Sequence, residues 1–217
     1  MKKKQDFGFS QEECDILSKL NTPKKIQDFI DELDYNLEEE GETYFSPRKV
    51  LQEKKANCIE GAIFAAAALR FHGHKPLIIV ITSVRDDDHV VAVFKRHGHW
   101  GALSKSKYTG LQFREPIHRT LRELVLSYFE GYFNFDGEKT LRGHSNLVNL
   151  SKFDKINWMT TENNLSCIED YFNKLKYKKL FKHRMIRELR TVTPMIKDAG
   201  ELWMTKNQVL EKARSKK

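Results

Sequence analysis

The segment 58–84 places a helix that is apolar on almost every side directly before an apolar strand. Residues 63–69 are Ile, Phe, four Ala and Leu, without a polar side chain. Gly73 and Pro76 then end the helical pattern. Residues 77–84 form an apolar, β-branched run, which is typical of a buried strand. We therefore expect the strand over 77–84 to lie in the interior of the fold and not at its surface.

Helix start signals lie on the amino-terminal side of this segment. Residues 10–13, Ser-Gln-Glu-Glu, form a capping box and predict a helix to about residue 20. Thr-Pro at 22–23 and Ser-Pro at 46–47 each join an N-cap residue to a proline at the first helical position. The second of these helices should end near residue 54. The first should have one apolar face, made of Ile26, Phe29, Ile30, Leu33 and Leu37.

A β-hairpin is predicted after the buried strand. Three aspartates at 86–88 form a turn, and strands are expected at 89–95 and 99–103, with His-Gly at 97–98 as the tight turn between them. The strand at 89–95 begins with His89. With Arg96 opposite His99, the register places His89 opposite Ser106 and diagonal to Ser104.

The carboxy-terminal third has a weaker pattern. We expect an amphipathic helix over 123–133, a strand near 147–158, a helix over 166–190 with a break, and a last helix from about 198. Helices that lead into consecutive strands indicate an α+β fold with a largely antiparallel sheet. We divide the chain into an amino-terminal extension (1–21), a core (22–135) and a carboxy-terminal region that packs on the core (136–217).

Composition excludes several classes of protein. No apolar run approaches the roughly 20 residues needed to span a bilayer, and residues 1–6 lack the apolar part of a signal peptide. Three widely spaced cysteines (Cys14, Cys58 and Cys167) argue against a disulfide framework and a structural zinc site. We therefore expect a cytoplasmic protein without membrane insertion.

Charge is distributed unevenly in this chain of net charge +8. Eleven acidic and three basic residues lie within 10–46, a balance of −8. Within 174–190, eight basic residues face one glutamate, a balance of +7. Such a segment could bind nucleic acid, but no nucleic-acid motif accompanies it. A solvated helix face that complements the acidic segment is the favoured interpretation.

Cys58 and His89 are the candidate catalytic pair. Cys58 stands where a polar loop meets the apolar helix, and unpaired N–H groups at a helix start favour thiolate over thiol. These N–H groups could also stabilise an oxyanion, with Asn57 as a possible side-chain contributor. His89 would take the thiol proton and later return it to the leaving amine.

The order of these motifs resembles the transglutaminase-like superfamily of papain-type cysteine enzymes. The likeness covers roughly 22–111: a cysteine that opens a small-residue helix, a glycine, a proline and an apolar strand, then His89 on the next strand. The family continues with tryptophan and, four residues on, aspartate. Here Trp100 is present but Ser104 stands at the aspartate position. The resemblance implies a Cys-bearing helix packed on an antiparallel sheet.

The group that orients His89 is expected to come from the strand of Trp100. Ser104 is the first candidate, with Ser106 and the distant Asp136 as alternatives. A serine hydroxyl can accept a hydrogen bond from the imidazole but adds no charge. Trp100, like Ser106, is also a candidate for contact with substrate.

Three functions are consistent with these features. The first is a cysteine enzyme that hydrolyses a peptide, protein or other amide, or transfers its acyl group to an amine, through a thioester. The second is a transglutaminase-like fold that has lost catalysis and serves as a binding or scaffold module, because the aspartate is missing. The third is a binder of nucleic acid. The chain has no nucleotide-binding glycine loop, and His97 and His99 lack acidic or thiol partners, so we expect no cofactor and no metal.

Overall fold

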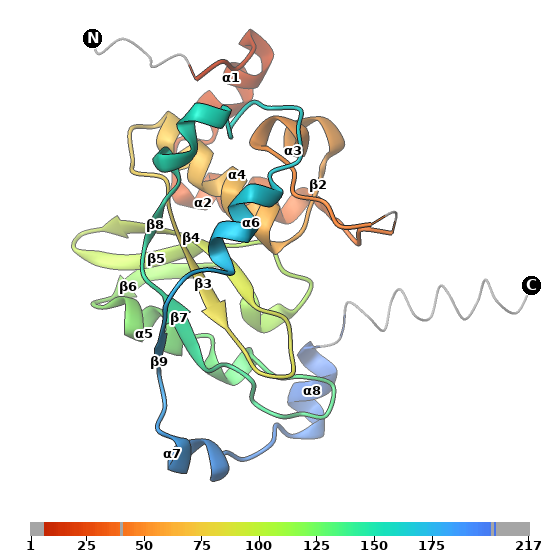
Figure 1. Ribbon diagram of the computed structural model, residues 1–217, viewed down its shortest axis with the longest axis vertical. Coiled ribbons are helices and arrows are strands. Elements are labelled where there is room, and N and C mark those ends of the chain that lie inside the picture. Colours follow the sequence, from red (N-terminus) through yellow and green to blue (C-terminus); the bar gives the residue numbers. More distant parts are fainter. Residues whose placement is uncertain (1–6, 40, 201, 203–217) are drawn as a thin grey trace, which may run out of the picture.

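The computed structural model describes residues 7–39, 41–200 and 202 of the chain. Its helices and strands have an α+β arrangement (Figure 1). The α-helices are α1 (Gln11–Lys19), α2 (Pro23–Glu32), α3 (Pro47–Glu53), α4 (Cys58–Phe71), α5 (Leu121–Leu126), α6 (Ser166–Phe172), α7 (His183–Arg187) and α8 (Pro194–Gly200). The strands are β1 (Asp34–Tyr35), β2 (Lys55–Ala56), β3 (Leu77–Thr82), β4 (His89–Arg96), β5 (His99–Leu103), β6 (Arg114–His118), β7 (Gly143–Ser145), β8 (Val148–Asn149) and β9 (Tyr177–Lys179). Short 3₁₀ helices are η1 (Thr109–Leu111), η2 (Phe129–Gly131) and η3 (Leu150–Ile156).

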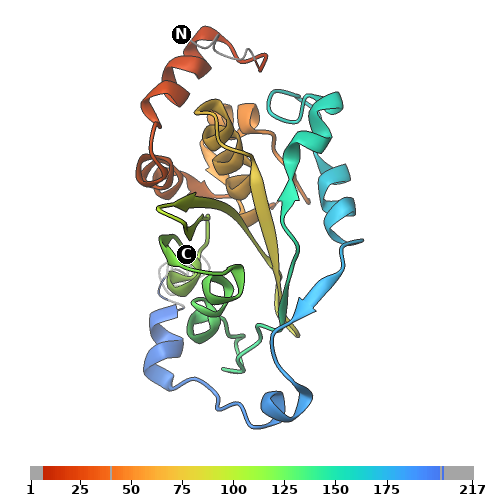
Figure 2. The same ribbon diagram turned by 90° about the vertical axis from the view of Figure 1, so that its left-hand side faces the viewer.

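The main sheet is antiparallel, with strand order β6-β5-β4-β3-β7-β9, and β8 also pairs with β3. The segments α1 to α4 gather at one end of the molecule, above the sheet in Figure 1. Figure 2 shows the carboxy-terminal segment, teal to blue, running beside β3 (yellow). The predicted α+β fold with an antiparallel sheet is confirmed.

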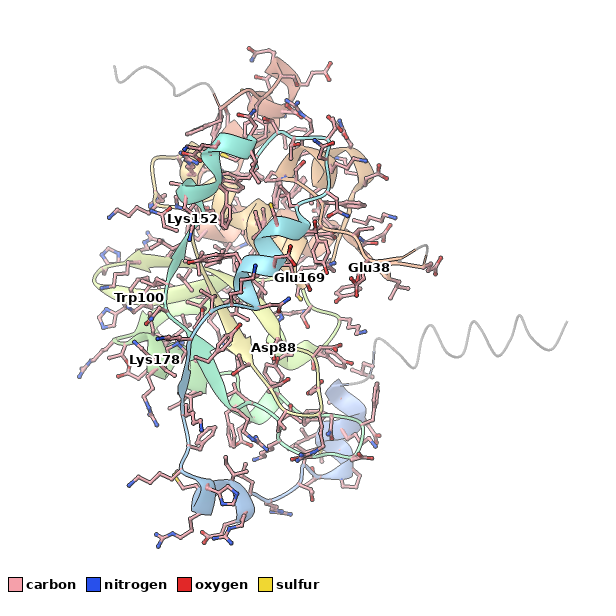
Figure 3. All side chains as sticks on the ribbon, viewed as in Figure 1. Glu38, Asp88, Trp100, Lys152, Glu169 and Lys178 are labelled. Carbon is pink, nitrogen blue, oxygen red and sulfur yellow. The ribbon has the colours of Figure 1, made fainter. Side chains whose placement is uncertain are left out.

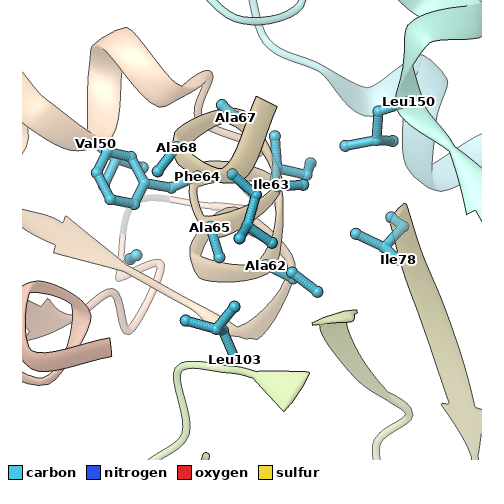
Figure 4. Close-up of a cluster of buried hydrophobic side chains, with 14 of the residues drawn as sticks. Val50, Ala62, Ile63, Phe64, Ala65, Ala67, Ala68, Ile78, Leu103 and Leu150 are labelled. Carbon is cyan, nitrogen blue, oxygen red and sulfur yellow. The ribbon is translucent and has the colours of Figure 1, made fainter. Parts of the chain in front are cut away.

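The two faces of β3 and β4 belong to two separate cores, as strand alternation requires. One face packs against α4, which is buried over nearly its whole length. Figure 4 shows this first core, with the alanines of α4 close to Val50, Ile78 and Leu103. The other face packs against α5 and the segments around it. The buried strand predicted from the β-branched run is therefore covered on both sides.

The amino-terminal helices begin where their caps predict. Ser10 and Glu13 form the capping box of α1, and Thr22 and Ser46 accept hydrogen bonds at the starts of α2 and α3. One expectation was wrong. The helix α2 ends at Glu32, because the chain turns extended to form β1, and the side chain of Leu37 is exposed instead of buried.

The hairpin has the predicted register. Arg96 lies opposite His99, and the pairing continues to Ala92 opposite Leu103. There β5 leaves β4, so the expected pair of His89 and Ser106 does not form. The loop after Leu103 instead leads to η1 and returns as β6, a strand that the sequence pattern did not indicate.

The carboxy-terminal third departs most from expectation. The helix predicted over 123–133 is the shorter α5 followed by η2. The strand predicted near 147–158 is limited to β8, and η3 follows it. The break in the helix predicted over 166–190 contains β9. The last helix, α8, begins at Pro194, and the chain beyond residue 202 lies outside the described residues. Among the described helices, none has the length and apolar character to span a bilayer.

Candidate active site

A cavity of about 330 Å³ contains both candidate catalytic residues. Cys58 and His89 line it, together with residues from the loop after β1, the turn before β4, the loop after β5, and α6. The two side chains are thus brought to one place, as predicted. No hydrogen bond between them is present in the described part of the chain.

Cys58 is the first residue of α4, and the cap before it fixes its position. The Asn57 Oδ1 atom accepts from the amide of Glu60 at 3.0 Å, and the Glu60 carboxylate accepts from the amide of Asn57 at 2.9 Å. This capping box satisfies two of the amides that a helix start leaves open. The Asn57 Nδ2 atom donates to Glu38 at 3.2 Å, so the proposed oxyanion contributor already has an acceptor.

Glu60 is completely buried and joins α4 to the loop that forms one wall of the cavity. Its carboxylate accepts hydrogen bonds from Asn36 Nδ2, Thr43 Oγ1 and the Phe45 amide, besides Asn57. A buried carboxylate is tolerated only when it is hydrogen-bonded in this way. These hydrogen bonds therefore hold the 36–45 loop over the start of α4.

The edge of β4 presents a backbone amide to the thiol. The Val80 amide donates to Ser145 Oγ at 3.0 Å and so points away from β4. Val80 pairs with Val90, which makes this a non-hydrogen-bonded pair, and the Val90 amide accordingly points away from β3. Because β5 has already diverged there, the Val90 amide can donate a hydrogen bond to the sulfur of Cys58. This hydrogen bond lowers the pKa of the thiol.

His89 is 4% exposed and is held by a backbone carbonyl. Its Nε2 atom lies 2.9 Å from the carbonyl oxygen of Leu111. A carbonyl only accepts, so in neutral His89 the proton is on Nε2, and Nδ1 is the basic nitrogen. The ring packs edge-to-face on Tyr128, with centroids 6.2 Å apart. The orientation of the imidazole thus comes from η1 and from the turn between α5 and η2.

This geometry corrects the expectation that a serine orients His89. Ser104 Oγ donates to the same Leu111 carbonyl at 2.9 Å, so it shares the acceptor of His89 and does not bond to the ring. Ser106 lines the cavity, but its hydroxyl accepts from the Tyr108 amide. The physical reason is the early divergence of β5, which removes both serines from the ladder.

The other two candidates lie away from the cavity. Trp100 is on β5, with the Lys95 ammonium 4.6 Å from its ring centroid, and it is not among the lining residues. Asp136 is exposed in the turn after η2, where its amide bonds to the Asn134 side chain.

Arg114 keeps the loop of Leu111 in place. Its guanidinium donates to the carbonyls of Gly110, Gln112 and Phe113 and to Ser127 Oγ. It also lies 3.9 Å from the ring centroid of Tyr128, on which His89 packs. Sequence reasoning missed Leu111, because a backbone acceptor leaves no residue-type signature. It missed Arg114, because the loop that this side chain holds was not predicted.

Burial keeps both members of the pair neutral. Desolvation raises the pKa of Cys58 to about 11, and Asp87 adds to this rise, while the Val90 amide opposes it. Desolvation lowers the pKa of His89 to about 4, the Leu111 carbonyl opposes the fall, and the positive charge of Arg114 adds to it. The resting site therefore contains a thiol and a neutral imidazole.

The described residues include no group of three or more His, Cys, Asp and Glu side chains arranged to hold a metal ion. Compared with models of known protein families and with curated protein sequences, the chain matches none. Any function assigned to the protein therefore rests on the geometry of the site.

Proposed function

We propose that the protein is a transglutaminase-like cysteine enzyme that acts on an amide of a peptide or protein through a thioester. One observation supports this most strongly: Cys58, at the start of a buried helix, lines the same cavity as His89, whose Nε2 is fixed and whose Nδ1 is unprotonated. A buried histidine with one nitrogen fixed is how a general base is commonly oriented.

The reaction needs only groups that this site contains. As the Cys58 sulfur attacks the amide carbon, the thiol proton passes to Nδ1 of His89, and the carbonyl oxygen becomes an oxyanion. The backbone amides of Cys58 and Val90, which lie at the sulfur, are the donors for that oxyanion. The C–N bond then breaks, and the imidazolium returns its proton to the leaving amine.

The second half of the reaction regenerates the thiol. Water or a second amine attacks the thioester carbon and gives its proton to His89, the C–S bond breaks, and Cys58 recovers a proton. Water gives hydrolysis, and an amine gives acyl transfer. Cys14, Cys58 and Cys167 form no disulfide bond with one another, which supports a cytoplasmic location for the enzyme.

The Leu111 carbonyl takes the place that an aspartate has in the family resemblance. It fixes the tautomer of His89 but provides no negative charge for the imidazolium. A lost partner charge costs on the order of 10²–10⁴ in rate, so we expect a slow enzyme.

Acetylation by p-nitrophenyl acetate tests this function without knowledge of the substrate. We expect one equivalent of nitrophenolate in a fast phase, with the acetyl group on Cys58 in peptide mapping, and none in Cys58→Ala. His89→Gln keeps a donor for the Leu111 carbonyl and should slow the phase at least tenfold. Acetylation of Cys58 no faster than that of Cys14 or Cys167, or unchanged in His89→Gln, would overturn the proposal.

A binding module that has lost catalysis is the second candidate. The neutral resting pair favours it, because an active cysteine enzyme commonly has a depressed thiol pKa. In that case, the acetylation experiment gives no phase that depends on His89.

A further inference from the structure

The cavity around Cys58 has the opposite charge to the protein. The chain has a net charge of +8. Among the charged residues of the cavity lining, carboxylates nevertheless predominate, and Lys107 is the one lysine or arginine among the described lining residues. The acidic lining residues are Glu38, Glu42, Asp86, Asp87, Asp88 and Glu169.

These carboxylates come from separate parts of the fold and surround the opening. Figure 3 shows Glu38, Asp88 and Glu169, which come from the loop after β1, the turn before β4 and α6. The 36–45 loop is fixed by Glu60, and Asp88 is fixed by the Ser83 amide at 2.8 Å. The described carboxylates are spread over several walls and do not converge on a metal site.

We propose that the substrate of Cys58 is a cationic peptide segment, in which a lysine or arginine side chain stands next to the amide that is attacked. This proposal rests on the proposed function, since it names the substrate of the same site. A second observation points to a ligand at this place: His89 lines this cavity and is 4% exposed. Its Nε2 atom is bound to Leu111, and its Nδ1 atom has no hydrogen bond to any described residue.

A cavity of one charge sign attracts ligands of the other sign. Carboxylates around a partly enclosed cleft raise the local concentration of cations and speed their arrival. A positive side chain close to the sulfur would also offset the charge of Asp87, which disfavours the thiolate of Cys58. Recognition of the substrate and activation of the nucleophile would then depend on the same charge.

The aromatic side chains of the cavity suit an ammonium or guanidinium group. Tyr35 and Tyr108 line it, and the Lys107 ammonium lies 5.5 Å from each ring centroid. Cations bind the faces of aromatic rings at such distances. These two rings therefore already contact the ammonium group of Lys107, and the carboxylates line the same cavity.

Amino-acid esters of different charge test the proposal on the full chain. The p-nitrophenyl esters of benzyloxycarbonyl-lysine, -norleucine and -glutamate carry a cationic, a neutral and an anionic side chain on the same reactive group. We expect Cys58 to be acylated by the lysine ester about tenfold faster than by the norleucine ester, and slowest by the glutamate ester. The ratio should fall toward unity in 1 M salt.

Paired variants separate the local charge from the charge of the whole protein. Glu42→Gln with Asp87→Asn should reduce the lysine-to-norleucine ratio at least threefold. Glu12→Gln with Asp15→Asn removes two exposed charges from α1, outside the cavity, and should leave the ratio unchanged. The norleucine rate shows whether each variant retains a folded site.

The outcomes distinguish this proposal from the function on which it rests. Acylation of Cys58 by all three esters at equal rates would overturn the cationic substrate and leave the enzyme function standing. A ratio that both pairs of variants reduce equally would also overturn it. No acylation of Cys58 by any ester, including the acetate, would overturn both.

Discussion

Cys58 and His89 have the residue types of a catalytic pair but not the ionisation of a preformed thiolate and imidazolium. Burial moves the two pKa values apart, to about 11 for Cys58 and about 4 for His89. A proton transfer at rest would place two charges in a desolvated site, which costs several kcal/mol. In the proposed reaction, the transfer is therefore coupled to the attack on the substrate.

The reactivity of Cys58 should depend steeply on pH. With a pKa of about 11, the thiolate fraction is small at pH 7 and rises about tenfold with each pH unit. We expect the rate of Cys58 alkylation by iodoacetamide, followed by peptide mapping, to rise from pH 7 to pH 10 without levelling. A plateau below pH 8 would instead show a stabilised thiolate.

His89 should make the protein less stable in mild acid. The unfolded chain binds a proton on this residue near pH 6.5, but the folded chain binds it only near pH 4. Between these values the unfolded state holds more protons, so the free energy of unfolding falls as pH falls, by about 3 kcal/mol at pH 4. Above pH 6.5 the imidazole is neutral in both states, so the protein has the full stability there and His89 causes no loss.

Urea unfolding of the protein and of His89→Gln at pH 7 and pH 4 measures that effect. The variant cannot titrate at this position, so its loss of stability over the interval should be smaller by about 3 kcal/mol. Equal losses in the two proteins would show that the imidazole is not held neutral.

At the scale of elements, the start of α4 is fixed by the hydrogen bonds of a buried acidic side chain. Glu60 joins the cap of α4 to the 36–45 loop, and each of its partners would lose an acceptor without it. The same position in α5, three residues after the cap, is held by Glu123, which is exposed. The Glu123 carboxylate accepts from the amide of Arg119, one residue before the cap, so the two helices have similar capping in different surroundings.

Glu60→Gln should destabilise the protein by about 3 kcal/mol, because an amide nitrogen would face donors in a buried site. Glu123→Gln is the matched control and should cost less than about 1 kcal/mol. Denaturant midpoints measure both. Similar small losses in the two variants would mean that water replaces the carboxylate of Glu60.

The sequence predicts the elements whose signals are local. Caps at Ser10, Thr22 and Ser46 mark helix starts, and the 97–98 turn sets the register of β4 and β5. The strands β6, β7 and β9 escape prediction because they are short and partly polar. The strands β7 and β9 also pair with strands that are not their neighbours in the sequence. Leu37 was misassigned because the β1–β2 pairing overrides helical periodicity.

The candidate site likewise has a part that the sequence predicts and a part that it does not. Residue type and spacing were sufficient to predict that Cys58 and His89 lie together, and both line one cavity. They were not sufficient for Leu111, since its contribution is a carbonyl that every residue has. The acidic lining was partly visible as the acidic segment 10–46, but only the fold joins two of its glutamates to the aspartates before β4.

For the whole molecule, the carboxy-terminal third belongs to both cores. The strands β7 and β8 pair with β3 at the centre of the sheet, and Ser145 accepts from the Val80 amide. Trp158 and Phe172 are buried with α4, and Leu141 is buried in the other core. Residues 136–200 therefore complete the sheet instead of covering a finished domain.

A chain that stops at residue 135 should not fold cooperatively. It would expose the edge of β3 and the apolar surface that residues 136–200 cover, which amounts to the loss of several large buried side chains. Urea unfolding followed by circular dichroism should show no sigmoidal transition for this fragment. A cooperative transition, together with acetylation of its Cys58, would show that the fragment is an independent domain.

The backbone acceptor of His89 has a consequence for genetic surveys of the whole chain. A mutational scan replaces side chains, and no replacement at position 111 deletes a carbonyl. Such a scan would therefore identify two reacting residues and no third. Sensitivity would appear instead at positions that shape the loop, such as Arg114 and Gly110, where an added Cβ would come within 2.6 Å of the Gly131 Cα atom. In this protein, the group that orients His89 would therefore depend on the conformation of a loop and not on the identity of one residue.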